Sequence, residues 1–445
     1  MSEIKVNKVS PRTNCGTVQL GDSGDTITIP AGATITNNGT QTGFGRTGTV
    51  NWQTGSIKTS TFTAANGEGY FCDTSSGPFT VNMPASPSAG NIVAFADYAG
   101  TAKNNNITID RNGSNIQGGT DNGLIDKDRE AVTFVYVDAT QGWVPVNDNA
   151  EIKQAAQFVA ATGGSLVTCG DVKIHTFTGP GTFCVSNAGN VVGSNEVSYV
   201  VIAGGGGGAN NRGGGGGAGG YREGKTPQCT PWTVSPADAG TGVPVTVQGY
   251  PITVGAGATG KPNSPTNRPG DDGSNSIFST IISAGGGGGG YNPSPSPGAG
   301  SDGGSGGGGG YPNKAGGSGN TPPVSPPQGN SGGTASSTNS GSGGGGAGAA
   351  GGAASNCTAG AGGAGITSGI TQSPVTRGGG GGGSGNSSGG AGGSGGGGTG
   401  YVGPGGSHPS DDGTVNTGGG GGASRNGPVA GAGGSGVVII RYKFQ

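Results

Sequence analysis

The sequence has little charge and few aromatic side chains. Charged residues make up 10% of its 445 positions and aromatic residues 5%, and 21 basic residues nearly balance 23 acidic ones. Without a basic run to bind phosphates, we expect no nucleic-acid partner. Apolar residues make up only 29% of the chain. That content is too low for the single large core of an ordinary enzyme of this length.

Long apolar stretches are also missing. The densest ones, Val197–Ala203 and Val437–Ile440, are too short to span a bilayer. The first residues, Met-Ser-Glu-Ile-Lys, lack the apolar core of a secretion signal. We therefore expect a soluble product made in the cytoplasm.

The cysteines form no Cys-x-x-Cys pair, and only two histidines could complete a metal site with them. We expect buried, reduced thiols at Cys15, Cys72, Cys169, Cys184, Cys229 and Cys357. The alternative is a bridge between Cys169 and Cys184 across the turn at 179–181. If Phe177 pairs with Thr182 there, Cys184 lies opposite His175, and that register disfavours the bridge.

Glycine is abundant and unevenly spread. Of 111 glycines, 26 lie in the first 200 residues, leaving 85 in the final 245. Between the glycine-rich segments, apolar residues alternate with period two, which predicts short β-strands and an all-β fold. The predicted strands are 25–30, 79–83, 106–110, 131–137, 172–177, 182–185, 196–202, 243–247, 251–254, 276–282 and 436–444.

One segment has helical spacing. In Glu151–Ala161, apolar residues recur at i, i+3, i+4 and i+7, with Asp148 or Asn149 as a cap and Gly163-Gly164 as a stop. About eleven residues make a marginal helix on its own. We therefore predict that it packs against the same helix in two other copies of the chain.

The glycine runs keep no Gly-X-Y triplet, which excludes collagen. They could form a flexible tether, because ordering a residue costs about 1–2 kcal/mol of backbone entropy. They could instead form a bundle of extended rods with three residues per turn, whose backbone groups all point outward and pair with neighbouring rods. The runs are matched at five or six residues, which favours the polyglycine-II-like bundle. Tyr221, Tyr291, Tyr311 and Tyr401 close runs and could cover its edge.

Catalytic and metal-binding patterns are weak. Asp271-Asp272-Gly273 and Asp411-Asp412-Gly413 could supply paired carboxylates or Ca²⁺ ligands, but Asp-Gly is equally typical of turns. His175 has no nucleophile or acid beside it in sequence, and no run ends in the Gly-Lys-Ser/Thr of a phosphate loop. We expect no enzyme activity, no metal and no cofactor.

Binding residues are expected in the turns between glycine runs. Polar, aromatic and isolated basic residues there suit recognition of a carbohydrate or an outer-membrane protein, while rods fix the turn bases. The candidates are Asn210, Asn211, Arg212, Tyr291, Asn292, Tyr311, Asn313, Lys314, His408, Arg425 and Asn426.

The glycine-rich half resembles the glycine-rich domain of bacteriophage tail-fibre and adhesin proteins. The resemblance rests on Lys173–Phe183, Val200–Gly208 and Gly433–Tyr442. In that family, the first and last strands enclose the glycine excursions. The long insertions vary most, so no receptor contact carries over to a residue of this chain.

The N-terminal half resembles a module of structural and fibre proteins from phages of marine cyanobacteria. The matching segments are Ser2–Lys8, Gly21–Gly32, Gly67–Phe71, Met83–Gly90, Arg111–Asn115 and Tyr136–Trp143. The resemblance implies a homotrimeric virion fibre that attaches to tail or capsid proteins through its N-terminus. We expect an attachment segment at 1–50, a β-rich module at 51–148, a helical linker at 149–166 and a glycine-rich head at 167–445. A non-adhesive capsid, vertex or tail-connector spacer is the alternative, and a depolymerase is the third possibility.

Overall fold

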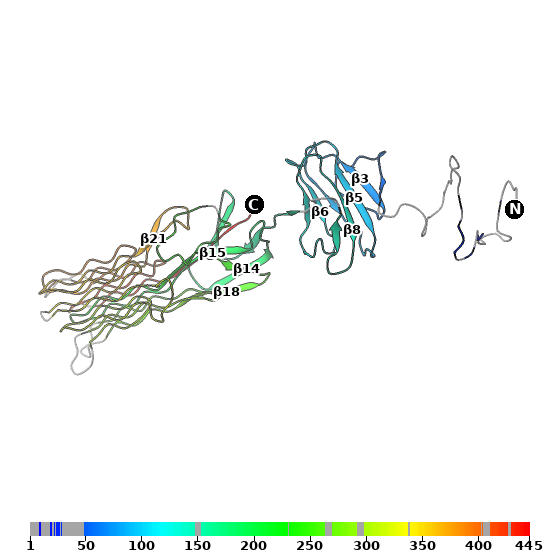
Figure 1. Ribbon diagram of the computed structural model, residues 1–445. Coiled ribbons are helices and arrows are strands. Elements are labelled where there is room, and N and C mark those ends of the chain that lie inside the picture. Colours follow the sequence, from blue (N-terminus) through cyan, green and yellow to red (C-terminus); the bar gives the residue numbers. More distant parts are fainter. Residues whose placement is uncertain are drawn as a thin grey trace. The chain divides into compact units, whose positions relative to one another are not determined.

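The protein consists of β-strands and extended glycine-rich segments (Figure 1). The computed structural model describes residues 9, 18, 19, 22, 24–26, 28, 49–146, 153–229, 231–262, 269–291, 298–336, 339–401, 403, 410–425 and 429–445. These residues contain no helix, so the all-β prediction is confirmed. The chain forms two compact units, the first made of 1–107, 112–118 and 126–150, and the second of 108–111, 119–125 and 151–445. Most of the predicted attachment segment lies outside the described residues. Of the strand predicted at 25–30, only residues 25, 26 and 28 are described, and none of these three is in a strand.

The N-terminal strands form two five-stranded sheets. The first has the order β1 (Asn51–Trp52), β3 (Glu68–Cys72), β5 (Ile92–Asp97), β8 (Ala131–Tyr136) and β9 (Trp143–Pro145). The second has the order β10 (Lys153–Gln154), β7 (Gly123–Ile125), β6 (Ile107–Asp110), β4 (Phe79–Asn82) and β2 (Phe62–Thr63). Alternate residues are buried, as in β6, where Ile107 and Ile109 are inside. The predicted strands at 79–83, 106–110 and 131–137 are therefore confirmed.

Two further sheets form a sandwich. One has the order β11 (Val159–Thr162), β14 (Gly181–Ala188), β18 (Gly249–Thr253), β19 (Ser276–Phe278) and β20 (Ile281–Ser283). The other has the order β12 (Ser165–Cys169), β13 (Val172–Phe177), β23 (Val437–Lys443), β15 (Glu196–Ile202) and β16 (Tyr221–Gly224), with β17 (Val243–Pro244) paired to β15. A separate hairpin joins β21 (Ile366–Ser368) to β22 (Val375–Arg377). The strands predicted at 172–177, 182–185, 196–202, 251–254 and 436–444 are present to within a few residues. The one predicted at 276–282 is instead the hairpin of β19 and β20, and the one predicted at 243–247 is reduced to β17.

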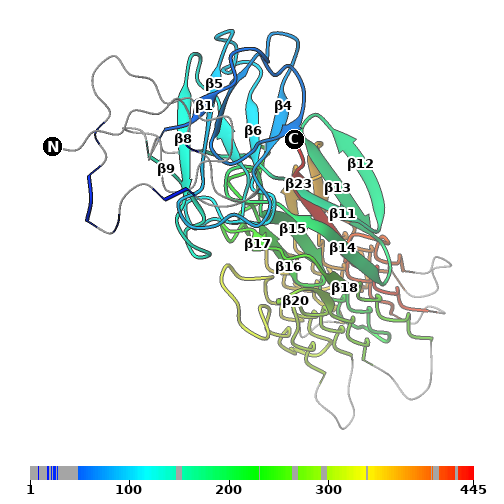
Figure 2. The ribbon, with the colours of Figure 1, turned by 90° about the vertical axis from the view of Figure 1, so that its right-hand side faces the viewer.

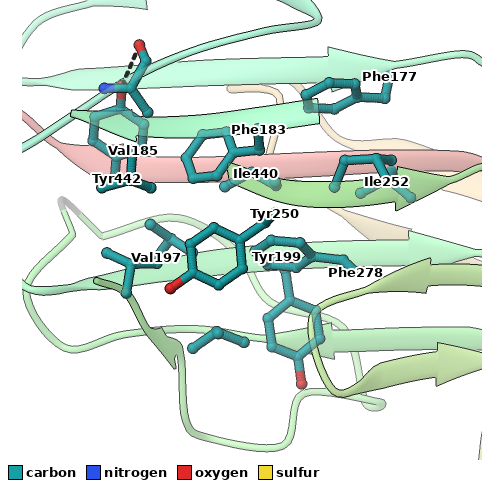
Figure 3. Packing of buried hydrophobic residues seen from close by; sticks show 14 of the residues in the cluster. Phe177, Phe183, Val185, Val197, Tyr199, Tyr250, Ile252, Phe278, Ile440 and Tyr442 are labelled. Carbon is teal, nitrogen blue, oxygen red and sulfur yellow. Dashed lines mark hydrogen bonds between the residues drawn. The ribbon is translucent and has the colours of Figure 1, made fainter. Parts of the chain in front are cut away.

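The core of the sandwich explains the long apolar runs in β15 and β23. Phe183 and Phe278 of one sheet meet Tyr199 and Tyr442 of the other in a buried cluster (Figure 3). Successive side chains of a strand point to opposite faces, so Val200 of β15 instead joins a second buried cluster on the other side of its sheet. A strand covered on both faces has no need of polar alternation.

The helix predicted over Glu151–Ala161 is wrong for the part of this segment that the structure describes. Residues 153–154 form β10, and β11 begins at Val159 and pairs antiparallel with β14. From Val159 onward the burial has period two, with Val159 and Ala161 in the core of the sandwich. A marginal helix of this length is outweighed by strand pairing and burial.

The glycine-rich segments form a bundle of extended rods, as predicted, rather than a tether. The run 204–209 continues from β15, and the run 430–436 leads back into β23. In Figure 1 the runs extend side by side away from the sheets, and in Figure 2 they are foreshortened and arranged in rows. Because β15 and β23 are paired neighbours, the first and last strands enclose the excursions at their base.

Each rod bonds to its neighbours in rotation. In run 204–209, residues three apart donate their N–H groups to the same neighbouring run. The bonds are Gly204 to Ser274 and Gly207 to Asp271, Gly205 to Gly434 and Gly208 to Gly431, and Gly206 to Gly217 and Ala209 to Gly214, with N···O distances between 2.9 and 3.1 Å. The period matches a helix with three residues per turn and no internal hydrogen bonds. Three further runs donate to its carbonyls, from Gly286, Ala258 and Gly421.

This close approach leaves no room for most side chains. A Cβ atom at Gly206 would overlap the backbone carbonyl of Gly287, whereas a Cβ atom at the next residue, Gly207, would lie 3.1 Å from the nearest atom, the carbonyl oxygen of Thr259. Glycine is thus required at some positions of a rod by its neighbours and not by its own backbone angles.

The two neighbouring glycines provide a matched test of the bundle. We predict that Gly206→Ala lowers the free energy of unfolding by about 2–3 kcal/mol, as overpacking does, because backbone must move to admit the methyl group. Gly207→Ala should stay within about 1 kcal/mol, because slight crowding is offset by a less flexible unfolded chain. Urea denaturation and amide hydrogen exchange measure both. Equal, small effects would contradict rigid packing.

His175 lies within the sandwich core. Its Nδ1 donates to the carbonyl of Gly163 at 2.6 Å, its Nε2 lies 3.1 Å from the hydroxyl of Tyr442, and its ring stacks on that tyrosine at 5.5 Å. Burial lowers the pKa of His175 below its ordinary value of 6.5. His175 is thus a buried structural residue of the core, as predicted.

The lowered pKa of His175 predicts acid sensitivity. As pH falls below about 6.5, the unfolded chain binds a proton that the folded chain excludes, so stability falls toward the folded-state pKa by up to about 1.4 kcal/mol per pH unit. His175→Gln should flatten this dependence in thermal melts between pH 7.5 and 5.5. His408→Gln is the control for the other histidine. An unchanged slope in His175→Gln would contradict the assignment.

Candidate binding surface at the turn end

The turns farthest from the sandwich gather into one surface, which we call the turn end. It comprises residues 210–212, 311–314, 336, 339–340, 355–358, 385–388 and 424–425. Backbone bonds join these turns. Ser424 donates to Ala209 at 2.9 Å, Ser384 to Gly213 at 3.2 Å, and Tyr311 to the carbonyl of Arg212 at 3.2 Å. The rods therefore fix the spacing of turns that are up to about 200 residues apart in sequence.

The turn 210–212 connects two rods through two left-handed residues. Asn211 and Arg212 have φ angles of 52° and 61°, a region in which asparagine is tolerated better than most residues. Asn210 is 3% exposed, and its Oδ1 accepts the N–H of Asn211 at 2.8 Å. Its amide nitrogen is buried and has no hydrogen-bond partner.

Arg212 lies against an aromatic ring of a neighbouring turn. Its guanidinium carbon is 5.3 Å from the ring centroid of Tyr311, a cation–π arrangement that orients the side chain. Its Nε is buried without a hydrogen-bond partner. Tyr311 and Tyr291 are both partly exposed, and the backbone of Tyr291 lies close beside Gly310.

Arg425 is the more deeply buried arginine. It is 7% exposed, its Nη1 donates to the Oδ1 of Asn386, and its Nε has no partner. Burial lowers the pKa of Arg425, and the positive charge of Arg212 lowers it further. The backbone bond from Ser424 to Ala209 makes the turns that carry the two cations neighbours.

The turn 311–314 is tied to a third rod. Asn313 is exposed, has a φ of 50° and donates its N–H to Ser336 at 3.1 Å. Lys314 donates its backbone N–H to Gly310, and its carbonyl accepts from Ala335 at 2.9 Å. Its side chain is partly exposed.

The structure brings together some of the predicted binding residues. Asn210, Asn211, Arg212, Tyr311, Asn313, Lys314 and Arg425 belong to the turn end, and Tyr291 lies beside it at Gly310. Asn292, His408 and Asn426 lie outside the described residues. Sequence reasoning missed Asn386 and Ser340, although each follows the same pattern of a polar residue between glycine runs. Tyr221 is buried in β16 at the sheet end of a rod, and Tyr401 is also buried.

The aspartate pairs lie within rods, not in turns. Asp272 accepts the N–H of Gly288 at 2.8 Å, and Asp412 accepts that of Ala432 at 2.7 Å. Asp271 pairs with Lys261 at 2.5 Å. Their carboxylates thus join neighbouring rods. Within the described residues, no group of three His, Cys, Asp or Glu side chains could hold a metal ion.

A buried carboxylate lies near the base of the bundle, away from the predicted site. Glu223 is 1% exposed and accepts hydrogen bonds from Tyr221 at 3.1 Å, Ser368 at 2.9 Å and the backbone of Ser235. Burial raises its pKa above the ordinary 4.5. These hydrogen bonds join β16 to the β21–β22 hairpin, so Glu223 has a structural role.

The described cysteines are free thiols, but only Cys72 and Cys229 are buried. Cys169 and Cys184 are exposed, and Cys357 is partly buried, which corrects the expectation of buried thiols at these positions. The Phe177–Thr182 pairing does not form either, because β13 and β14 belong to different sheets. Cys15 lies outside the described residues.

Comparison with known families identifies the second half of the chain. A family model described as a glycine-rich domain matches residues 178–443, which is more than half of the sequence. The chain belongs to this glycine-rich domain family. No curated protein matched the sequence. No helix in the described part of the chain is long and apolar enough to cross a membrane.

The left-handed turns predict which substitutions the turn end tolerates. Asn313→Gly should leave stability within about 0.5 kcal/mol, because glycine adopts positive φ readily. Asn313→Val should cost about 1–2 kcal/mol, because a branched side chain is strained there. Denaturation curves of the two variants provide the measurement. A neutral Asn313→Val would show that the turn does not hold this conformation.

Proposed function

We propose that this protein is a bacteriophage tail fibre that attaches to the host cell through the turn end of its glycine-rich domain. The single observation that carries the proposal is the separation of the rods from the turns. Rods are held by backbone bonds such as Gly206 to Gly217, while polar and aromatic side chains collect where the turns meet. A rigid frame with variable turns suits recognition.

The resemblance to phage fibre modules supports the remaining parts of the proposal. We propose that the N-terminal segment attaches the protein to tail or capsid proteins and that the fibre is a homotrimer. The protein is assembled in the host cytoplasm and is then located in the virion. The host ligand is a cell-surface polysaccharide or an outer-membrane protein. The protein then acts by binding and not as an enzyme.

The test combines localisation with binding. Labelled antibodies on intact particles should mark the tail tip, and the full-length chain should sediment with host envelopes. Replacing both Tyr311 and Lys314 by alanine should weaken sedimentation at least about tenfold, a loss of 1.4 kcal/mol or more. Leu166→Ala, on the exposed strand β12, is the matched control and should bind normally.

Other outcomes point to other functions. A label on the capsid or neck together with no envelope binding would overturn the proposal in favour of a spacer. Release of reducing sugar from host polysaccharide would instead indicate a depolymerase, which needs a pair of catalytic carboxylates.

A further inference from the structure

Four polar groups with hydrogens to donate are buried at the turn end without a partner. They are the Nδ2 of Asn210, the Nε of Arg212, the Nε of Arg425 and the hydroxyl of Ser340. A buried donor left unsatisfied costs about 1–3 kcal/mol, and more when it is charged. A ligand that supplies hydrogen-bond acceptors to these four donors would therefore stabilise the folded protein.

Backbone bonds bring these groups together. The bond from Ser424 to Ala209 places Arg425 beside Asn210, since each is the next residue in its chain segment. Gly341 donates to Ser384, which in turn donates to Gly213, so the residues that precede them, Ser340 and Arg212, both lie next to the end of the rod that contains Ser384. Arg212 is partly exposed, so this group of residues reaches the surface of the turn end.

The charge of this group is positive and unbalanced. The turn-end segments contain no aspartate or glutamate, and neither do the connecting sequences 292–297, 402–409 and 426–428. In the described part of the chain, no carboxylate forms an ion pair with Arg212 or Arg425. The backbone of Asp411 is level with Gly422, about 9 Å along the rod from Arg425 at roughly 3.1 Å per residue.

The geometry points to a carboxylate ligand. We infer that Arg212, Arg425 and the amide of Asn210 bind the carboxylate of an acidic polysaccharide, such as one built from uronic acids. Arginine donates two parallel hydrogen bonds to a carboxylate, and each arginine here is held by a neighbour, Tyr311 or Asn386, that leaves its Nε unused. The tyrosine faces and turn amides beside the site suit the sugar ring and its hydroxyls. This inference rests on the proposed host-binding function and names its ligand class.

The test measures binding of the full-length chain to three immobilised polysaccharides: alginate, which carries carboxylates, dextran sulfate and neutral dextran. Alginate should bind at least about tenfold more tightly than neutral dextran. Arg212→Lys and Arg425→Lys keep the charge but remove the paired donors, and each should weaken alginate binding about tenfold, the effect of one charge-assisted hydrogen bond. Lys103→Ala removes a charge from an exposed position in the first unit, outside the turn end, and should change binding less than twofold.

Several results would overturn the inference. They are equal binding to alginate and neutral dextran, wild-type affinity in both lysine variants, or a preference for dextran sulfate that falls equally in Lys103→Ala, which would indicate diffuse attraction. Melting curves show whether each variant folds. If Arg425→Lys fails to fold, the result for Arg212→Lys decides the test. The outcome is separable from that of the proposed function, because envelope binding that persists in both lysine variants refutes this ligand while leaving host attachment supported.

Discussion

The structure depends on the hydrogen bond between one bare main chain and another. Fixing a residue costs about 1–2 kcal/mol of backbone entropy, and a typical intramolecular hydrogen bond contributes about 0.5–1.5 kcal/mol net. The two nearly cancel, so an isolated glycine rod would not be stable. The bundle becomes stable because each rod bonds to several others. In addition, its first and last rods continue into the strands β15 and β23, which bury apolar side chains in the sandwich. The apolar surface that the glycines lack is provided by the sheets at the base.

This arrangement divides the sequence into positions with different constraints. Inside a rod, a Cβ atom at a position such as Gly206 would overlap a neighbouring carbonyl, so the residue is fixed by packing. In a turn, the requirement is a left-handed backbone, which asparagine meets at Asn211 and Asn313. Exposed side chains there, such as that of Asn313, are otherwise unconstrained by the rods. Variation at the turns therefore changes the surface without altering the hydrogen-bonded interior.

Much of this fold could be predicted from the sequence, and the exceptions have physical causes. The strands at 172–177, 196–202 and 437–443 were visible because burial on one or both faces leaves a β-branched, apolar pattern. The helix at 151–161 failed because a few alanines fit a helical period and a strand equally, and only pairing with β14 decides between them. The turn residues could be predicted from their place between glycine runs. Their grouping could not, since the order in which rods neighbour one another depends on contacts between distant segments.

The cost of burying Arg425 shows how the bundle can support a binding site. A buried guanidinium with one side-chain partner lowers stability, and a small domain with a single core could tolerate little of this. Here the core that stabilises the domain lies between the sheets, while the arginines lie in turns at the opposite ends of the rods. The rods transmit no side-chain packing between the two regions, because they have almost no side chains. The turn end can therefore hold donors without a hydrogen-bond partner in fixed positions. A ligand that accepted hydrogen bonds from these donors would gain their free energy without any rearrangement of the rods.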